Sequence, residues 1–276
     1  MREAIELRRR KGARIGLVPT MGALHEGHLS LVRASNERCD HTVATIFVNP
    51  TQFGPNEDFS RYPRTLEQDL ALLAGERVEM VYSPTPEAMY PQGYSTYIEP
   101  PSTAKRLEGE LRPGHFRGVC TVVLKLFQAA PADTAFFGRK DYQQAMVIQQ
   151  MTRDLDLWTE IAICPIVRDS DGLALSSRNR YLSPSERERA LGLSRALAAA
   201  KSAVDAGERN SETIRSLMRS TLLAAEVDSI DYVSIAHGES LEELEQVAAP
   251  AVALIAARVG TTRLIDNEIL LSSIAT

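Results

Sequence analysis

The feature that most constrains the fold is an alternation of short apolar runs and helix-like stretches over roughly the first 168 residues. The run Thr42–Val48 is β-branched and apolar throughout, which is typical of a strand buried on both faces. Strands separated by helices predict a Rossmann-like parallel sheet with helices on both faces, an α/β fold. Pro165 predicts an edge position or a bulge for the last strand. The expected strands are 15–18, 42–48, 78–82, 134–137 and 159–167.

Helical periodicity fills the gaps between these strands. Thr65 and Gln68 fit a capping box, and apolar residues follow at helical spacing at Leu66, Leu70 and Leu73. A helix is therefore expected directly after Pro63. Similar periodicity predicts helices over 116–130 and 142–155.

The sequence pattern changes after Asp169. The segment Ser183–Glu186 combines a capping residue, a proline at the first helical position and a glutamate at N3, so a long helix should run to about Ala206 and end at Gly207. A second helix and three strand-like runs follow, at 212–225, 230–236, 251–258 and 263–271. We therefore predict a Rossmann-like domain over residues 1–168 and a smaller α+β domain over 169–276.

Composition excludes several classes of protein. The formal net charge of −5 argues against a general polyanion binder, so no nucleic-acid partner is expected. The three cysteines are far apart and contain no C-x-x-C pair, which argues against a disulfide framework and a zinc ribbon. The longest apolar run, 247–257, is too short to span a membrane, and the first residues lack the apolar core of a secretory signal. We therefore expect a cytoplasmic location and no membrane partner.

Four polar, glycine-containing segments each follow a predicted strand. In a parallel sheet the carboxyl ends of the strands lie at one edge, where α/β folds bind ligands. The sequence therefore predicts one site built from four loops. The segments are PTMGALHEGH, NPTQFG, GRKDYQQ and RDSDGLALSSRNRY.

The first segment carries His25 and His28, three residues apart. A helix beginning near Glu26 would place both histidines in its first turn, where free N–H groups and the helix dipole attract phosphate. A pair of capping or solvent-facing histidines is the alternative. A metalloprotease zinc site requires H-E-x-x-H, and this spacing differs.

The other segments offer cations and neutral amides. Lys140 and Arg178 could neutralise a polyphosphate, although a solvated loop lysine and a polar hinge are the plainer interpretations. Gln52 and Gln144 could orient a small hydroxylated or carboxylated substrate without adding charge, or could be ordinary surface residues. Asn49 and Tyr62 could join them.

The motifs PTMGALHEGH, FVNPTQFG, LEGELRPGHFRGV, FFGRKDYQQ and DGLALSSRN, in this order and spacing, strongly resemble the pantothenate synthetase (pantoate–β-alanine ligase) family. The resemblance covers almost the whole chain. HEGH is similar to the histidine signature of the nucleotidyltransferase superfamily, and LSSRN to the second signature of that superfamily. One departure is Arg178, which stands where that second signature places a lysine. A second is the N-terminus: about a dozen residues precede Ile15, where family members carry a short strand and a helix.

The resemblance implies an ATP- and magnesium-dependent enzyme, a homodimer whose smaller domain acts as a lid. It implies that pantoate and ATP give pantoyl adenylate and pyrophosphate, and that β-alanine then gives pantothenate and AMP. It implies that His28 is the active-site histidine and that Gln52 and Gln144 bind pantoate, with Gln52 near the incoming β-alanine as well. The need for cations at the leaving pyrophosphate adds His25, Lys140 and Arg178 as catalytic candidates. Asn49 and Tyr62 could join the glutamines at the substrate. The residues implied to contact ATP are Met21, Gly22, Ala23, Leu24, His25, Glu26, Gly27, His28, Gly138, Arg139, Lys140, Asp141, Val167, Leu175, Ser176, Ser177 and Arg178.

Three other functions fit the motifs less well. An adenylyltransferase could activate another small acid or a nucleotide. A regulator could bind ATP without turnover. A zinc hydrolase could be built on His25 and His28. Substrate screening by pyrophosphate exchange and metal analysis would separate these from the ligase.

Overall fold

The computed structural model describes residues 1–55 and 57–272. Contacts divide the chain into two units, one formed by Met1–Arg139 and Gln143–Pro165 and the other by Lys140–Tyr142 and Ile166–Thr276. Each unit is described by itself. The domain boundary after residue 168 stays a prediction; the contacts place the change between the two units nearby, after Pro165.

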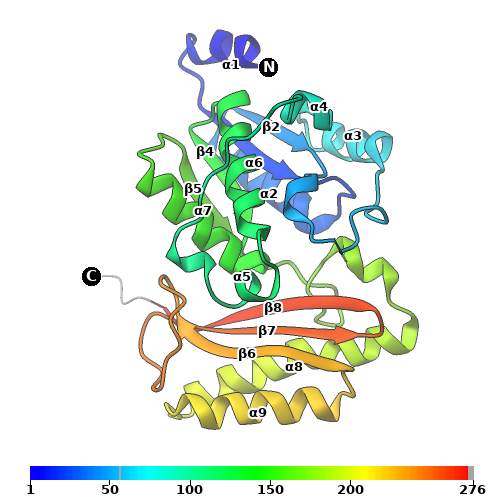
Figure 1. Ribbon diagram of the computed structural model, residues 1–276, viewed down its shortest axis with the longest axis vertical. Coiled ribbons are helices and arrows are strands. Elements are labelled where there is room, and N and C mark those ends of the chain that lie inside the picture. The colour runs from blue at the N-terminus through cyan, green and yellow to red at the C-terminus, as the bar shows by residue number, and fades with distance from the viewer. Residues whose placement is uncertain (56, 273–276) are drawn as a thin grey trace. The chain divides into compact units, whose positions relative to one another are not determined.

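The first unit contains a five-stranded sheet in the order β3-β2-β1-β4-β5, in which every pair is parallel (Figure 1). Val18 of β1 lies opposite Ala44 of β2, and Leu17 lies opposite Ala135 of β4. The strand order reverses direction at β1, and this switch point is where such sheets bind ligands beyond the strand ends. The strands are β1 (Ile15–Thr20), β2 (His41–Ile46), β3 (Met80–Tyr82), β4 (Thr134–Gly138) and β5 (Glu160–Cys164).

Helices cover both faces of this sheet, as predicted. Leu17 belongs to a buried cluster with Val123 of α6 and Ile148 of α7, whereas its neighbour Val18 joins Leu31 of α2 and Leu73 of α3. Successive strand residues point to opposite faces, so a strand buried on both sides must be apolar throughout. The helices are α1 (Arg2–Arg9), α2 (Glu26–Arg38), α3 (Leu66–Gly75), α4 (Pro86–Met89), α5 (Glu108–Leu111), α6 (His115–Ala129) and α7 (Tyr142–Asp154), with short 3₁₀ turns η1 (Pro50–Gln52), η2 (Ser102–Ala104) and η3 (Arg139–Asp141).

Helix α3 begins where the sequence predicts but buries a different face. The predicted capping box is wrong: Thr65 makes no side-chain cap, because its hydroxyl donates to Asp69 Oδ2 at 3.2 Å. Leu66 and Leu70 are 45% and 41% exposed, whereas Asp69 and Leu73 are each 1% exposed. Residues four apart share a helix face, so the buried face carries a carboxylate and a leucine.

Strand β5 is an edge strand, as its proline predicts. It ends at Cys164, so Pro165 follows the last paired residue and removes no hydrogen bond from the ladder. Before β1, the chain forms helix α1, which ends at Arg9 in a run of basic residues that comprises Arg8, Arg9, Arg10, Lys11 and Arg14.

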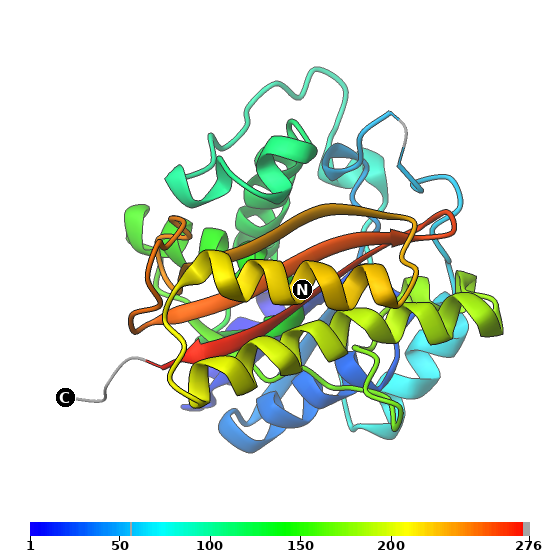
Figure 2. The ribbon, with the colours of Figure 1, turned by 90° about the horizontal axis from the view of Figure 1, so that it is seen from below.

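The second unit is built on an antiparallel sheet in the order β6-β7-β8. Helices α8 and α9 pack against one face of this sheet (Figure 2). Ser183 and Glu186 form the predicted capping box, and Gly207 has the left-handed φ of +102° after the helix ends. The elements are η4 (Ser177–Tyr181), α8 (Pro184–Asp205), α9 (Ser211–Ala224), β6 (Ser229–His237), β7 (Ala251–Val259) and β8 (Thr262–Leu271).

The cysteines are thiols in the structure. Cys39 and Cys120 are buried and Cys164 is half-buried. Burial raises the pKa of Cys120 to about 12, so this thiol is not a nucleophile near neutral pH. Across residues 1–55 and 57–272, none of the helices combines the length and the apolarity that a bilayer crossing requires.

Candidate nucleotide and substrate site

The loop between β1 and α2 is held by the hydroxyl of Thr20 at the end of β1 and by the carboxylate of Asp69 on α3. The Gly22 N–H donates to Thr20 Oγ1 at 3.2 Å. The N–H groups of Ala23 and Leu24 donate to the two carboxylate oxygens of Asp69 at 2.9 and 2.8 Å. These backbone donors are therefore satisfied within the protein.

The two histidines lie together at the start of α2, as predicted. Their ring centroids are 4.1 Å apart. His25 Nδ1 accepts from the Gly27 N–H at 3.2 Å, and His28 Nδ1 accepts from the His25 N–H at 3.3 Å, so the rings cap the helix. Because each Nδ1 is an acceptor, we assign the proton of each neutral ring to Nε2. Both rings therefore lie at a helix N-terminus, where phosphate is favoured.

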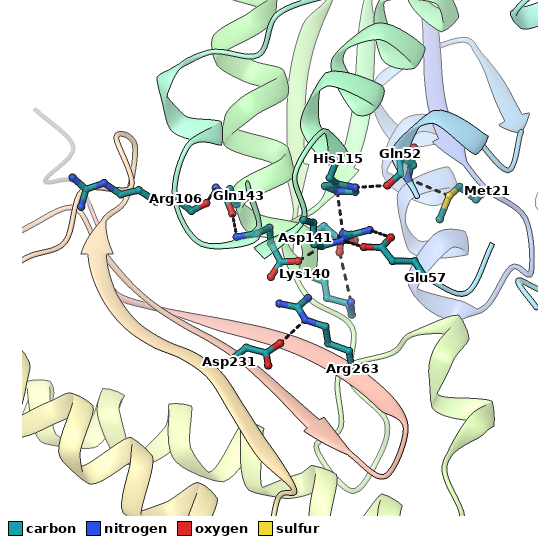
Figure 3. A network of polar contacts seen from close by, with 12 residues as sticks. Met21, Gln52, Glu57, Arg106, His115, Lys140, Asp141, Gln143, Asp231 and Arg263 are labelled. Atoms are coloured by element: carbon teal, nitrogen blue, oxygen red, sulfur yellow. Dashed lines mark hydrogen bonds and ion pairs between the residues drawn. The ribbon is translucent and has the colours of Figure 1, made fainter. Parts of the chain in front are cut away.

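The loop after β2 is held from inside by Asn49. Its side-chain amide donates to Gln52 Oε1 at 3.0 Å and to the Gly118 carbonyl at 3.3 Å, and its carbonyl oxygen accepts from the Tyr90 hydroxyl at 2.8 Å. Asn49 is only 1% exposed. Gln52 Nε2 lies 3.4 Å from Met21 Sδ, so this loop and the histidine loop are in contact (Figure 3).

His115, which the sequence analysis did not assign, anchors Gln52. Its Nδ1 lies 2.8 Å from the Gln52 carbonyl oxygen, and its Nε2 lies 3.1 Å from Arg112 Nη1 (Figure 3). Burial, reinforced by the nearby Arg112 charge, lowers the pKa of His115 to about 4. The ring is therefore neutral near pH 7, with Nδ1–H donating to Gln52 and Nε2 accepting from Arg112. In the sequence, only its position within the family motif LEGELRPGHFRGV indicates that His115 is a functional residue.

Arg112 is itself held by a bidentate ion pair. Its Nε and Nη2 donate to the carboxylate of Glu57 at 2.6 and 2.7 Å. Burial alone would raise the pKa of Glu57, but the Arg112 hydrogen bonds and charge bring it below its usual value. Glu57, Arg112, His115 and Gln52 thus form one chain of polar contacts.

Adjacent glutamines at the start of α7 have different environments. Gln143 is 3% exposed; its amide donates to the carbonyls of Thr103 and Arg106 at 2.9 and 2.7 Å and accepts from the Glu108 N–H at 3.0 Å. Gln143 therefore fixes the preceding loop. Gln144, the predicted substrate residue, is half-buried one position further along the helix.

Three other residues predicted for the site, Tyr62, Gly138 and Arg139, also lie in the first unit. Tyr62 is 6% exposed and packs edge-on against Phe53, with ring centroids 6.0 Å apart. Gly138 ends β4, and Arg139 begins the turn η3 that leads to the lysine. Tyr62 therefore contributes packing to the loop after β2.

By its contacts, the lysine segment belongs to the second unit. The Lys140 carbonyl accepts from Asn267 Nδ2 at 3.0 Å, and the Tyr142 hydroxyl donates to the Gly238 carbonyl at 2.8 Å. Asn267 is 1% exposed. Lys140 Nζ lies 3.6 Å from Asp141 Oδ1, so the amine is close to the adjacent carboxylate.

The remaining predicted residues form a compact turn in the second unit. The Leu175 N–H donates to the Val167 carbonyl at 3.0 Å. Ser176 caps η4, because its Oγ accepts from the Arg178 N–H at 3.3 Å. The second signature motif therefore begins a 3₁₀ turn whose first residues include Ser177 and Arg178.

The parallel sheet with polar loops at its switch point defines an α/β protein of the Rossmann-like, nucleotide-binding class. The chain matches the family model for pantoate-beta-alanine ligase over residues 1–269. It is 56% identical to a pantothenate synthetase of Roseiflexus castenholzii over 93% of this chain and 92% of that protein. It is 52% identical to a pantothenate synthetase of Moorella thermoacetica over 98% of this chain and 95% of that protein.

Solved structures agree with the sequence comparisons. The pantothenate synthetase of Thermus thermophilus superposes with a TM-score of 0.91 at 44% identity, covering 94% of each chain. The Francisella tularensis pantoate-beta-alanine ligase, complexed with βγ-ATP and β-alanine, gives 0.79 at 36% identity, covering 98% of this chain and 95% of that chain. The chain belongs to the pantoate–β-alanine ligase family. It is an ATP-dependent ligase that forms pantothenate from pantoate and β-alanine.

Proposed function

We propose that the reaction proceeds through pantoyl adenylate. The pantoate carboxylate attacks the α-phosphate of ATP, and pyrophosphate leaves. The amine of β-alanine then attacks the acyl carbon, and AMP leaves as the amide forms. A carboxylate is ionised and nucleophilic at pH 7, so the first step needs positioning and cations for the growing charge on pyrophosphate, with no general base.

The histidine pair is the observation that supports this proposal most directly. His25 and His28 lie in ring contact at the N-terminus of α2, and capping uses the Nδ1 of each ring. Their Nε2–H groups are suited to donate to phosphate oxygens, and the helix dipole favours the same negative charge. In the proposed mechanism both rings stabilise charge that develops on the phosphates.

Further residues are proposed to contact ATP. Lys140 and Arg178 supply positive charge for the pyrophosphate, and Ser177 supplies a hydroxyl. Ala23 and Leu24 line the site through other atoms, because Asp69 accepts their N–H groups. The remaining nucleotide residues of the proposal are Met21, Gly22, Glu26, Gly27, Gly138, Arg139, Asp141, Val167, Leu175 and Ser176.

Pantoate is proposed to bind at the two half-buried glutamines. Gln52 and Gln144 can hydrogen-bond a hydroxyl and a carboxylate without adding charge. Gln52 is also proposed to lie near the incoming β-alanine. Asn49 and Tyr62 support the same loop from inside, because both are buried and in contact with it.

Magnesium is proposed to accompany ATP. Mg²⁺ usually takes one or two carboxylates together with substrate phosphates and water. Within residues 1–55 and 57–272, no three side chains of His, Cys, Asp or Glu are grouped as a metal site. The half-exposed carboxylate of Asp141 next to Lys140 fits a single ligand, with ATP phosphates as the others. The ion would add positive charge at the leaving pyrophosphate.

Three further properties are proposed. Two of them, a lid role for residues 169–276 and a homodimeric assembly, come from the family, and the third, a cytoplasmic location, is expected from the sequence features described above. Lid closure would protect the adenylate, because acyl adenylates hydrolyse in water.

Pantoate-dependent exchange of labelled pyrophosphate into ATP tests the adenylate directly. We expect His28→Ala and Lys140→Ala each to reduce exchange at least tenfold and to leave the fold intact, because each removes a donor to phosphate. His41→Ala, at the amino end of β2, and Lys201→Ala, paired with Asp205 on α8, are the matched controls and should keep wild-type exchange. Wild-type exchange in both test variants would reject their assignment, and wild-type enzyme without pantoate-dependent exchange would reject the adenylate.

A further inference from the structure

Asp69 is a buried carboxylate with three partners around the histidine loop. It is 1% exposed on the inner face of α3. Oδ2 accepts from the Ala23 N–H at 2.9 Å and from the Thr65 hydroxyl at 3.2 Å, and Oδ1 accepts from the Leu24 N–H at 2.8 Å. One side chain therefore satisfies two consecutive backbone donors of a loop 45 residues away in sequence.

The backbone of this loop has a left-handed conformation at two consecutive residues. Ala23 has a φ of +50° and Gly22 a φ of +84°, in the left-handed region that residues other than glycine adopt at a cost. A Cβ at Gly22 would lie 2.9 Å from Asp69 Oδ2 and 3.2 Å from Ile46 Cγ2. Only glycine therefore leaves room for the Asp69 carboxylate at position 22, and the two residues together fix the backbone between β1 and α2.

Apolar packing fixes α3 in the same place. Leu73, one turn after Asp69 and also 1% exposed, shares a buried cluster with Leu24 and Leu31. Helix α3 thus contacts Leu24 in two ways: Asp69 accepts its N–H, and Leu73 lies in the same apolar cluster as its side chain. Leu24 immediately precedes His25, so a displacement of this backbone would move the first residue of the histidine pair.

We propose that Asp69 is a positioning residue for adenylate formation: its carboxylate locks residues 22–24 so that His25 and His28 are held for the phosphates of ATP. The role is indirect, because Asp69 acts through the loop backbone. It rests on the proposed function of the histidine pair.

Asp69→Asn tests this role with little change in shape. The amide keeps one oxygen and replaces the other with an NH₂ group, so one of the two loop N–H groups loses its acceptor and faces a donor. Asp133→Asn is the matched control. Asp133 also accepts from a backbone N–H of the same strand region, that of Ile15 at 2.8 Å, but at the other end of β1.

Enzyme kinetics and amide hydrogen exchange both measure the effect. Asp69→Asn should raise the KM for ATP and lower pantoate-dependent pyrophosphate exchange, each at least tenfold, while the second step from supplied pantoyl adenylate changes less than threefold. Amide hydrogen exchange at residues 23 and 24 should accelerate at least tenfold, with exchange in the middle of β1 unchanged. Asp133→Asn should change neither the ATP KM nor exchange at 23 and 24 by more than about twofold.

Either of two outcomes would overturn the proposal. The first is hydrogen exchange at residues 23 and 24 that matches wild type in Asp69→Asn. The second is an unchanged ATP KM in a variant whose loop has loosened. The hydrogen-exchange result does not depend on catalysis. It therefore tests the contact between Asp69 and the loop backbone even if the reaction does not form an adenylate. Pyrophosphate exchange by the wild-type enzyme judges the proposed function separately.

Discussion

The two contacting loops of the first unit are held in place by different chemistry. The histidine loop is held by a buried carboxylate, because Asp69 accepts two of its N–H groups. The Gln52 loop is held by the neutral groups of Asn49 and His115. Hydrogen bonds to an ionised group are roughly twice as strong as neutral ones. Protonation of His115 would keep the Nδ1–H donor to Gln52, but it would remove the Nε2 acceptor for Arg112 and place a charge in a buried site, which makes this anchor sensitive to acid.

The largest effect that should sharpen this contrast is the acid sensitivity of His115. Its pKa is about 4 in the folded protein against 6.5 for an ordinary histidine, so the unfolded chain binds the proton more readily. Stability from the neutral ring is therefore complete above pH 6.5 and is lost as the pH falls toward 4. The difference amounts to about 3 kcal/mol.

Urea unfolding of wild type and His115→Gln between pH 4 and 7 measures this loss. The free energy of unfolding of wild type should fall by about 3 kcal/mol more than that of the variant over this range. Parallel pH profiles for the two proteins would show that His115 is not the acid-sensitive anchor. A direct NMR titration of the His115 ring provides an independent check.

A somewhat smaller effect is expected from Gly118→Ala, which attacks the Gln52 loop sterically. A Cβ at Gly118 would lie 2.3 Å from the Thr51 carbonyl oxygen and 2.7 Å from the Gln52 nitrogen, both backbone atoms. The loop must move, and we expect a destabilisation of about 2 kcal/mol with a higher KM for pantoate.

Gly75→Ala is the control for this prediction. A Cβ there meets nothing within 4 Å, and the residue ends helix α3. Its thermal stability and its KM for pantoate should remain at wild-type values. If Gly118→Ala also left the thermal stability and the KM for pantoate unchanged, the close approach of α6 to the Gln52 loop would not constrain that loop.

The smallest expected effect concerns the ion pair behind His115. Glu57→Gln removes the charge that Arg112 binds, but both side chains are partly exposed, at 24% and 20%, so we expect a loss below about 1 kcal/mol. The pKa of Glu57 is lowered in the fold, so its contribution is present near neutral pH and is lost as the pH falls through that lowered value. Thermal melts of wild type and variant at low and high salt measure it, and a loss that salt does not reduce would contradict a charge-based role.

Much of the fold can be predicted from the sequence because the parallel strands are short and mostly apolar. The edge position of β5 follows from Pro165, and the start of α8 follows from the pattern at Ser183. The histidine pair could also be placed at the start of α2, because apolar residues at helical spacing, Leu29, Leu31 and Val32, follow it directly. In these cases a local pattern determines the local structure.

The supporting residues could not be predicted, because their roles depend on contacts between distant segments. Periodicity favoured Leu66 and Leu70 as the buried positions of α3, yet Asp69 is buried instead. Loop amides 45 residues away compensate the cost of burying its carboxylate, and a helical pattern does not contain that information. The same holds for His115, whose partner is a carbonyl 63 residues away.

The link between Lys140 and Asn267 limits how this enzyme can be cut into smaller pieces. A fragment that stops at Pro165 would retain the lysine and every strand of the parallel sheet, but its lysine turn would lack both the Asn267 amide and the Gly238 carbonyl. Minimal versions of the protein designed from the sheet alone would therefore keep the Lys140 side chain and lose the contacts that hold its backbone. Split or circularly permuted versions should keep residues 140–142 on the same piece as β8.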